Sequence, residues 1–262
     1  MRERVCPICS SEKFSVFKEI SIKEKHYLLA KCLACQFVYV LNPDMDTVNH
    51  DTMSCESVPV VHQRYVQTKK LLDRTFKTAR QVDILEIGSG CGALGKLLNE
   101  DERYQYSGYE PSVPRSQSCR DQGLNVVTGF FEKKTFSGKV DVVILDNVLE
   151  HVLHPDVLIS DAADVLRPDG LLIVIVPNLH DIRQHIPSWK KRHYWQPGCH
   201  INYFTRHHLK RLLMKNGLVF RTFGFCSLDW QRDLPLWLVK VVLDRIGFCC
   251  LGLYCYGIKS EK

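Results

Sequence analysis

The sequence lacks any long uninterrupted apolar run. Its longest apolar stretch, residues 234–253, contains Lys240, Asp244 and Arg245, which a membrane-spanning helix tolerates poorly. The N-terminus, Met-Arg-Glu-Arg-Val-Cys-Pro, has no apolar core of the kind that a secretory signal peptide needs. We therefore expect a cytoplasmic protein without a transmembrane segment. Residues 236–246 have the pattern of a helix docked on a sheet, with peripheral membrane contact as the alternative.

Acidic residues are nearly missing between residues 181 and 221. This segment holds nine Lys or Arg and a single acid, Asp181, whereas the whole chain of 262 residues carries a formal charge of +6. Such a surface suits a phosphate-bearing or lipid-linked acceptor, an anionic membrane or RNA, and a solvated positive face explains it equally well. Trp189 and Trp195 lie among the basic residues, as in a lid over a sugar or a surface that stacks bases.

Cysteine, in contrast, is abundant, with 12 residues. In a reducing compartment this number argues for thiols or metal rather than disulfides. Four of them form two Cys-x-x-Cys pairs that 22 residues separate: Cys6, Cys9, Cys32 and Cys35. Two such pairs can place four thiolates at the corners of a tetrahedron, which predicts a structural Zn²⁺ ion, with four free thiols as the alternative.

The residues around these cysteines alternate between apolar and polar, as short strands do. We therefore predict a zinc ribbon over residues 1–43. Residues 44–80 follow as a linker and a helix, in which apolar residues recur every three or four positions from Val58 to Phe76. The main domain is expected over residues 81–262.

A glycine-rich turn opens that domain. Residues 82–95 read Val-Asp-Ile-Leu-Glu-Ile-Gly-Ser-Gly-Cys-Gly-Ala-Leu-Gly, so a buried strand with Glu86 near its end leads into Gly88, Gly90 and Gly92. Glycine allows positive φ and close approach of a ligand to the backbone, and the following helix directs its N-terminus at that ligand. Glu86 and Glu110, which follows the next expected strand, suggest a ligand with positive charge or vicinal hydroxyls.

Strands and helices then alternate to the end of the chain. We expect strands at 82–87, 105–109, 125–128, 140–145, 171–176, 218–225 and 252–258, and helices at 93–99, 112–122, 155–166, 205–217 and 236–246. This alternation predicts an α/β fold with a doubly wound, Rossmann-like sheet of seven strands, and a ligand at the carboxyl ends of the strands.

Several motifs in this order resemble those of class I S-adenosylmethionine-dependent methyltransferases. They are the turn after Glu86, Gly108-Tyr-Glu110, Asp146-Asn-Val-Leu-Glu-His151, Leu166-Arg-Pro-Asp-Gly170 and His200-Ile-Asn-Tyr-Phe204. A cysteine ribbon ahead of such a domain is similar to that of sugar and cell-envelope methyltransferases. Those with sugar C-methylation activity carry a further C-terminal domain, which we do not expect within these 262 residues.

The resemblance implies roles for individual residues. Gly88, Gly90 and Gly92 would admit S-adenosylmethionine (SAM) against bare backbone, Glu86 would organise the turn and favour the cationic end of SAM, and Glu110 would accept hydrogen bonds from the ribose. Phe131 would cover the adenine, with core packing as an equal alternative. Asp146 and Asn147 would contact the cofactor or the acceptor.

A dinucleotide fingerprint is the competing interpretation, because Gly88-Ser-Gly-Cys-Gly-Ala93 fits its loose form. A carboxylate two residues before the first glycine would repel a pyrophosphate, whereas a sulfonium carries positive charge. Methyl transfer is therefore the better explanation.

A hydroxyl acceptor must lose its proton, and histidine is the usual base near neutral pH. His200 and His151 are the two candidates, and His200 is preferred because it follows the fifth strand, on the expected acceptor side.

The sequence thus predicts a SAM-dependent methyltransferase acting on a small polar acceptor such as a sugar, a sugar nucleotide or a cell-envelope glycan precursor. One alternative is an RNA methyltransferase that grips RNA with the ribbon and the basic segment 183–215. Another is a SAM-binding adaptor without catalytic activity.

Overall fold

The computed structural model describes residues 4–44, 63–77, 81–180, 195–222 and 252–260. Its strands are β1 (Phe14–Ile22), β2 (Lys25–Cys32), β3 (Val38–Val40), β4 (Val82–Ile87), β5 (Tyr104–Glu110), β6 (Val126–Thr128), β7 (Val140–Asp146), β8 (Leu166–Pro177), β9 (Asn202–Tyr203), β10 (Leu218–Thr222) and β11 (Gly252–Lys259). Its α-helices are α2 (Gln63–Thr75), α3 (Ala93–Asn99), α4 (Val113–Asp121), α5 (Pro155–Asp164) and α7 (Arg206–Lys215), and a short 3₁₀ helix, η2, spans Lys133–Thr135.

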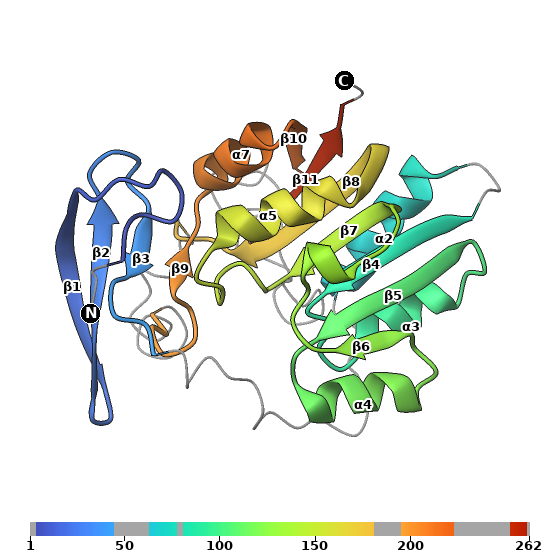
Figure 1. Ribbon diagram of the computed structural model, residues 1–262, viewed down its shortest axis with the longest axis horizontal. Coiled ribbons are helices and arrows are strands. Elements are labelled where there is room, and N and C mark those ends of the chain that lie inside the picture. The colour runs from blue at the N-terminus through green and yellow to red at the C-terminus, as the bar shows by residue number, and fades with distance from the viewer. Residues whose placement is uncertain (1–3, 45–62, 78–80, 181–194, 223–251, 261–262) are drawn as a thin grey trace, which may run out of the picture.

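The larger sheet has seven strands in the order β10-β11-β8-β7-β4-β5-β6 (Figure 1). Strands β4 to β8 are parallel to one another, whereas β11 runs antiparallel to both β8 and β10. Every residue of β7 is buried, as expected for a central parallel strand that helices cover on both faces. The predicted doubly wound sheet of seven strands is confirmed.

Helices cover the two faces of this sheet in separate groups. On one face, Leu72 of α2 and Leu94 of α3 pack in one core with Ile84 and Ile144 of the sheet. On the other face, residues of α5 and α7 pack in a second core with Leu85, Leu145 and Val174. Successive strand residues point to opposite faces, so the nearly continuous apolar runs of β7 and β8 supply both cores.

The predicted boundaries agree with the structure within a few residues, with one informative difference. Strand β8 begins at Leu166 rather than at Leu171, because residues 167–170 bulge out between the pairs Val140–Leu166 and Val142–Leu171. The predicted turn therefore exists inside the strand. The predicted helix at 236–246 and the end of the predicted strand at 218–225 lie outside the described residues.

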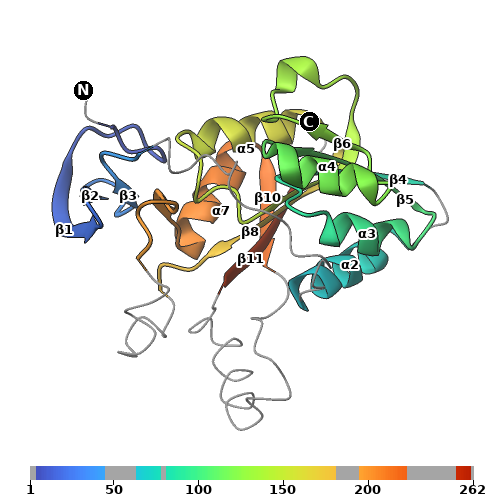
Figure 2. The same cartoon turned by 90° about the horizontal axis from the view of Figure 1, so that it is seen from below.

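The smaller sheet is antiparallel in the order β1-β2-β3-β9 and lies at one end of the molecule (Figures 1 and 2). Its fourth strand, β9, comes from a segment expected as a loop, and Asn202 and Tyr203 pair with Tyr39 and Val38. Phe37 and Tyr39 lie in the same hydrophobic core as Phe204 and the residues of α7. The N-terminal strands are therefore packed onto the main domain through a shared sheet and a shared core.

Arg4 strengthens this junction. Its guanidinium donates hydrogen bonds to the carbonyl oxygens of Val40, Ile201 and Leu153 and to Oδ1 of Asn202, at 2.8–3.2 Å. One side chain thereby joins the N-terminal sheet, β9 and the loop after β7. In the part of the chain that the structure describes, no helix is long and apolar enough to cross a bilayer.

Candidate functional site

The glycine turn between β4 and α3 lies at the carboxyl edge of the larger sheet. Gly88, Gly90 and Gly92 all have positive φ, at 81°, 55° and 80°. They differ in what surrounds them. A Cβ on Gly92 would lie 2.6 Å from Leu124 and one on Gly88 2.6 Å from Val148, whereas a Cβ on Gly90 would meet no atom within 4 Å. Gly90 is therefore the glycine that faces open space.

Glu110 ends β5 beside this turn and is 3% exposed. One of its carboxylate oxygens, Oε2, accepts a hydrogen bond from the Gly90 N–H at 2.8 Å, and Oε1 accepts one from the Ser112 N–H at 3.0 Å. A carboxylate offers about four lone-pair positions, so roughly two remain for a ligand. Glu110 therefore closes the turn and keeps acceptor capacity toward vicinal hydroxyls.

Glu86 lies under the turn and is 3% exposed. The hydroxyl of Tyr106 donates a hydrogen bond to its Oε2 at 2.5 Å. Burial raises the pKa of Glu86 to about 8, although the Tyr106 hydroxyl opposes the shift. A cation bound beside this carboxyl would favour its ionised form.

Asp146 and Asn147 follow at the end of β7. The Asn147 side chain donates to Oδ1 of Asp146 at 2.7 Å, and Asn147 itself has a φ of 54°. The other oxygen of Asp146 accepts a hydrogen bond from Nε of Arg64 at 2.7 Å. Burial raises the pKa of Asp146 and Arg64 opposes that shift.

Sequence reasoning missed Arg64. This residue lies on α2, 82 positions before Asp146, and no motif surrounds it. The guanidinium also donates to the Tyr65 hydroxyl at 2.9 Å, so α2 brings one cation and one phenol to an edge otherwise rich in acids.

Phe131 follows β6 in the main core, where its ring packs edge-on against Tyr109 at 5.4 Å. The neighbouring Phe130 is 72% exposed. Of the two rings, Phe131 is fixed by packing, and Phe130 is accessible beside the carboxyl end of β6.

Residues 60–222 match the model of a family described as a methyltransferase domain. This match covers more than half of the chain. The chain belongs to this methyltransferase family. No curated protein sequence matches it.

Solved structures with the same fold are distant in sequence. A SAM-dependent methyltransferase from Archaeoglobus fulgidus aligns with a TM-score of 0.53 and 17% identity over 75% of this chain and 94% of that chain. The magnesium protoporphyrin IX methyltransferase of Synechocystis PCC 6803, solved with bound S-adenosylhomocysteine (SAH), aligns with a TM-score of 0.54 and 15% identity over 76% and 83%. The CurJ carbon methyltransferase aligns with a TM-score of 0.53 and 14% identity, over 75% of this chain and only 54% of that chain.

The methyltransferase domain brings its two candidate catalytic histidines together. His151 lies in the turn after β7 and His200 just before β9, and their ring centroids are 4.9 Å apart. Burial lowers the pKa of His200 to about 4, so its imidazole is neutral at physiological pH. Glu150, the residue before His151, has no role predicted from the sequence; it is 1% exposed, and burial raises its pKa to about 8.

The four N-terminal cysteines also converge, with all four sulfurs within 4.8 Å of one another. The distances from Cys6 Sγ to Cys35 Sγ and from Cys9 Sγ to Cys32 Sγ are both 3.5 Å. In a tetrahedral site with Zn–S bonds of about 2.3 Å, neighbouring sulfurs lie ~3.8 Å apart. The four sulfurs therefore fit a zinc ion with small adjustments.

The two Cys-x-x-Cys turns have the same local structure. In each, the N–H of the residue after the second cysteine donates to the carbonyl of the first, at 2.8 Å for Ser10 and 2.9 Å for Gln36. These two residues also have positive φ, at 59° and 62°. Burial acts to raise the pKa of Cys32, but the backbone N–H groups of Cys35 and Ala34 lower it to about 7. Such N–H groups stabilise the thiolate that a metal requires.

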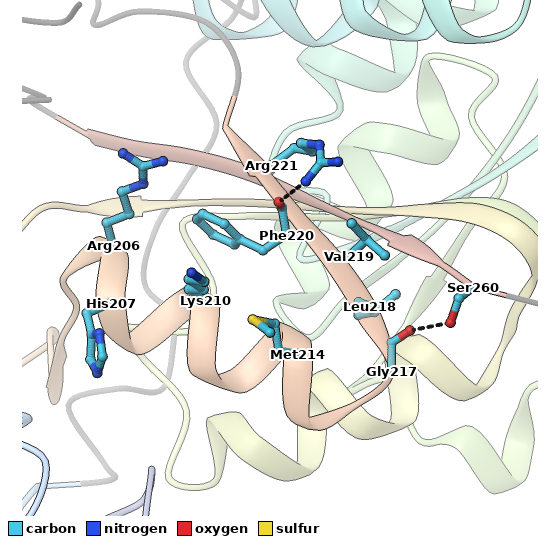
Figure 3. Close-up of a pocket in the computed structure, with 10 residues that line it drawn as sticks. All are labelled: Arg206, His207, Lys210, Met214, Gly217, Leu218, Val219, Phe220, Arg221 and Ser260. Carbon is cyan, nitrogen blue, oxygen red and sulfur yellow. Dashed lines mark hydrogen bonds between the residues drawn. The ribbon is translucent and has the colours of Figure 1, made fainter. Parts of the chain in front are cut away.

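Two surface clefts of the domain are lined by basic residues. The first, of about 860 Å³, lies between α7 and β10, where Arg206, Lys210 and Arg221 surround the ring of Phe220 (Figure 3). The second, of about 610 Å³, lies between the N-terminal sheet and α7 and contains Lys31, His180, Trp195, His207 and Arg211. Neither has an acidic residue among its described lining residues.

Proposed function

We propose that this protein transfers a methyl group from SAM to a small polar acceptor such as a sugar, a sugar nucleotide or a cell-envelope glycan precursor. The observation that carries the proposal is the hydrogen bond from the Gly90 N–H to Glu110. In a dinucleotide site the amides of the turn hold a pyrophosphate. Here an anionic side chain occupies one of them, which disfavours a phosphate and suits a ligand with ribose hydroxyls and positive charge.

The residues of the turn fit SAM as follows. Glu110 would accept the ribose hydroxyls, Gly88 and Gly90 would lie against the nucleoside, and Gly92 would hold the turn on α4. Glu86, Asp146 and Asn147 would face the charged end, and Phe131 would stand at the adenine side. When bound, SAM supplies a methyl group on a cationic sulfur, so the protein mainly aligns the acceptor and excludes water.

The acceptor's proton is removed, in this proposal, at the histidine pair, with His200 as the preferred base and His151 as its neighbour. The lowered pKa of His200 keeps a lone pair available at neutral pH. The buried carboxyl of Glu150 lies beside the pair and can stabilise positive charge there.

The proposed acceptor carries phosphate or another anionic group. The cleft beside the N-terminal sheet supports this, because it combines cations with Trp195, whose ring contacts Phe17 and Tyr203 and the ammonium of Lys18. An indole face beside cations suits a sugar that bears phosphate. Solved structures of the same fold include a magnesium protoporphyrin IX methyltransferase and a plantazolicin methyltransferase, which supports varied acceptors for this fold.

We further propose that Cys6, Cys9, Cys32 and Cys35 hold a structural Zn²⁺ ion. We also propose that residues 1–43 form the ribbon, residues 44–80 a linker and helix, and residues 81–262 the methyltransferase domain. We propose a cytoplasmic location for the protein.

The proposal is tested by incubating the purified chain with methyl-labelled SAM and fractionated metabolites, lipids and RNA. We expect label in a phosphate-bearing small molecule or a lipid-linked precursor. Binding of SAM without labelling of any fraction would instead support an adaptor without catalytic activity.

An RNA methyltransferase is the second candidate. The cleft between α7 and β10 (Figure 3) favours this candidate. There the guanidinium of Arg206 lies 5.7 Å from the centroid of the Phe220 ring, which gives a cationic and aromatic surface. Label confined to RNA, together with a steep loss of RNA binding as salt rises, would establish it over the small-molecule acceptor.

A further inference from the structure

Glu150 is a buried carboxyl with no visible reason for its burial. It lies four residues after the end of β7, is 1% exposed, and neither of its carboxylate oxygens has a hydrogen-bond partner among the described residues. Buried carboxylates are normally paired, hydrogen-bonded or bound to a metal ion. This orphaned group therefore points to a missing partner.

His151 is oriented toward that group. Its Nδ1 lies 2.7 Å from the carbonyl oxygen of Cys199. A carbonyl can only accept, so Nδ1 carries the proton, and in the neutral ring the lone pair is on Nε2. Nε2 faces Oε1 of Glu150 at 3.9 Å. Histidines that bind a metal ion usually donate their other ring N–H to a carbonyl or carboxylate in this way, which fixes the ring orientation.

His200 completes the group from a distant segment. Its ring lies nearly edge-on to that of His151, at 4.9 Å and 69°, and one ligand atom from each of Glu150, His151 and His200 lies within 4.8 Å of the others. Ligand atoms on one ion with bonds of ~2.1 Å lie about 3 to 3.5 Å apart. Small side-chain rotations therefore suffice to bring all three onto one cation.

We propose that Glu150, His151 and His200 bind a divalent first-row transition metal ion, separate from the cysteine site. Two imidazoles and one carboxylate favour such an ion over Mg²⁺ or Ca²⁺, which prefer oxygen ligands alone. Three protein ligands leave at least one position open, whereas the four-cysteine site is closed.

The open position suits a hydroxyl of the acceptor, and this part of the inference rests on the proposed function. A hydroxyl on the cation loses its proton to water more readily, because the positive charge stabilises the oxygen anion that remains. With the cation bound, both histidines are ligands, so His200 assists by holding the ion rather than by taking the proton itself.

The N-terminal sheet would help to form this site. Asn202, two residues after His200, pairs with Tyr39 of β3, and its side chain donates to the carbonyls of Leu149 and Val152 on either side of Glu150 and His151. The same residue thus ties the segment of His200 to the turn that carries the other two ligands.

The test uses Mn²⁺ and the full chain carrying one equivalent of zinc, which the four thiolates bind and for which Mn²⁺ competes poorly, so that the second site stays open to Mn²⁺. Free Mn²⁺ is followed by electron paramagnetic resonance during titration. We expect about one Mn²⁺ per chain, as a single site requires, and binding weakened more than tenfold in both Glu150→Gln and His200→Ala. His154→Ala is the matched control, since His154 is an exposed histidine at the start of α5 outside the cluster, and it should bind Mn²⁺ like the wild type.

SAH binding is measured on the same samples, so that a misfolded variant is recognised by loss of both ligands. A wild-type chain that binds SAH but no Mn²⁺, or variants that bind Mn²⁺ as the wild type does, would overturn the metal site and leave the proposed function standing. A chain that binds Mn²⁺ but neither SAM nor SAH would overturn the proposed function and keep the metal site.

Discussion

The two halves of the site differ in how the chain builds them. The cofactor half, from Glu86 through the glycine turn to Glu110, lies on two neighbouring strands within one short stretch of sequence. The proposed acceptor half combines Glu150 and His151 with His200 from a distant segment, and Arg64 joins the proposed site from 82 positions before its partner Asp146. Local backbone requirements leave a motif in the sequence, whereas a single side chain that arrives from a distant segment, such as Arg64, leaves none.

The largest effect is expected from loss of the zinc ion that we propose for the four N-terminal cysteines. Cys6→Ser/Cys9→Ser should lose the one zinc ion expected per chain by elemental analysis and unfold the N-terminal sheet, because structural zinc contributes roughly 10 kcal/mol of folding free energy in small domains. Strand β9 pairs with β3, so hydrogen exchange at residues 201–204 should rise.

In that variant the cofactor half should be less affected than the acceptor half. The affinity for SAH should therefore change little, even where hydrogen exchange at residues 201–204 rises. Cys199→Ser is the control, since its sulfur lies outside the cluster, and it should keep its zinc. Wild-type protein that is folded and free of metal would refute the zinc ribbon.

The next largest effect is expected at Glu110. Glu110→Ala leaves the N–H groups of Gly90 and Ser112 without their acceptor and removes the contact proposed for the ribose. Each lost hydrogen bond to a charged group is worth about 1.5–3 kcal/mol, so calorimetry should show SAH affinity reduced by about 100-fold or more. The exposed Glu102, just before β5, provides the control Glu102→Ala, which should bind SAH normally.

Substitutions at Gly90 and Gly92 should separate effects on cofactor binding from effects on stability within the turn. Gly92→Ala would place a Cβ 2.6 Å from Leu124 and 3.0 Å from Cys119, so we expect a loss of about 2–3 kcal/mol in stability by denaturant unfolding. Gly90→Ala meets no atom within 4 Å, so it should cost only the ~1 kcal/mol of positive φ while weakening SAH binding. Equal effects of the two substitutions on affinity would show that the turn does not face the cofactor at Gly90.

A smaller effect concerns pH. Burial raises the pKa of Glu86 to about 8, so the chain without cofactor holds a proton there at neutral pH. A cationic ligand favours the ionised form, so binding releases this proton, and SAM affinity should rise from pH 6 toward pH 8 and level off above it, by at most about tenfold per pH unit.

Glu86→Gln should flatten this dependence in calorimetric titrations. Glu150→Gln is the matched control, because Glu150 is a second buried glutamate with a pKa raised to about 8 that lies outside the cofactor turn, and it should keep the dependence. An unchanged pH dependence in Glu86→Gln would place the responsible group elsewhere.

Much of the fold followed from the sequence because its signals are local. Apolar runs, glycine turns and the cap at Thr205 gave the strands of the larger sheet and α7, which begins with a capping box between Thr205 and His208. The paired cysteines likewise indicated a compact cluster of four sulfurs.

The remainder depends on tertiary contacts that no single segment encodes. Asn202 and Tyr203 form a strand only because β3 offers an edge, and His208 is buried because its Nε2 reaches the carbonyl of Cys35. Arg64 matters because of its hydrogen bond to Asp146, which is remote in sequence. Glu150 matters because it is buried and its carboxylate oxygens have no hydrogen-bond partner among the described residues.

Isothermal titration of the purified chain with SAH and, separately, with NAD shows which of the two ligands the glycine turn and Glu110 bind. We expect heat of binding for SAH that Glu110→Ala removes, and none for NAD. Binding of NAD without any binding of SAH or SAM would contradict it.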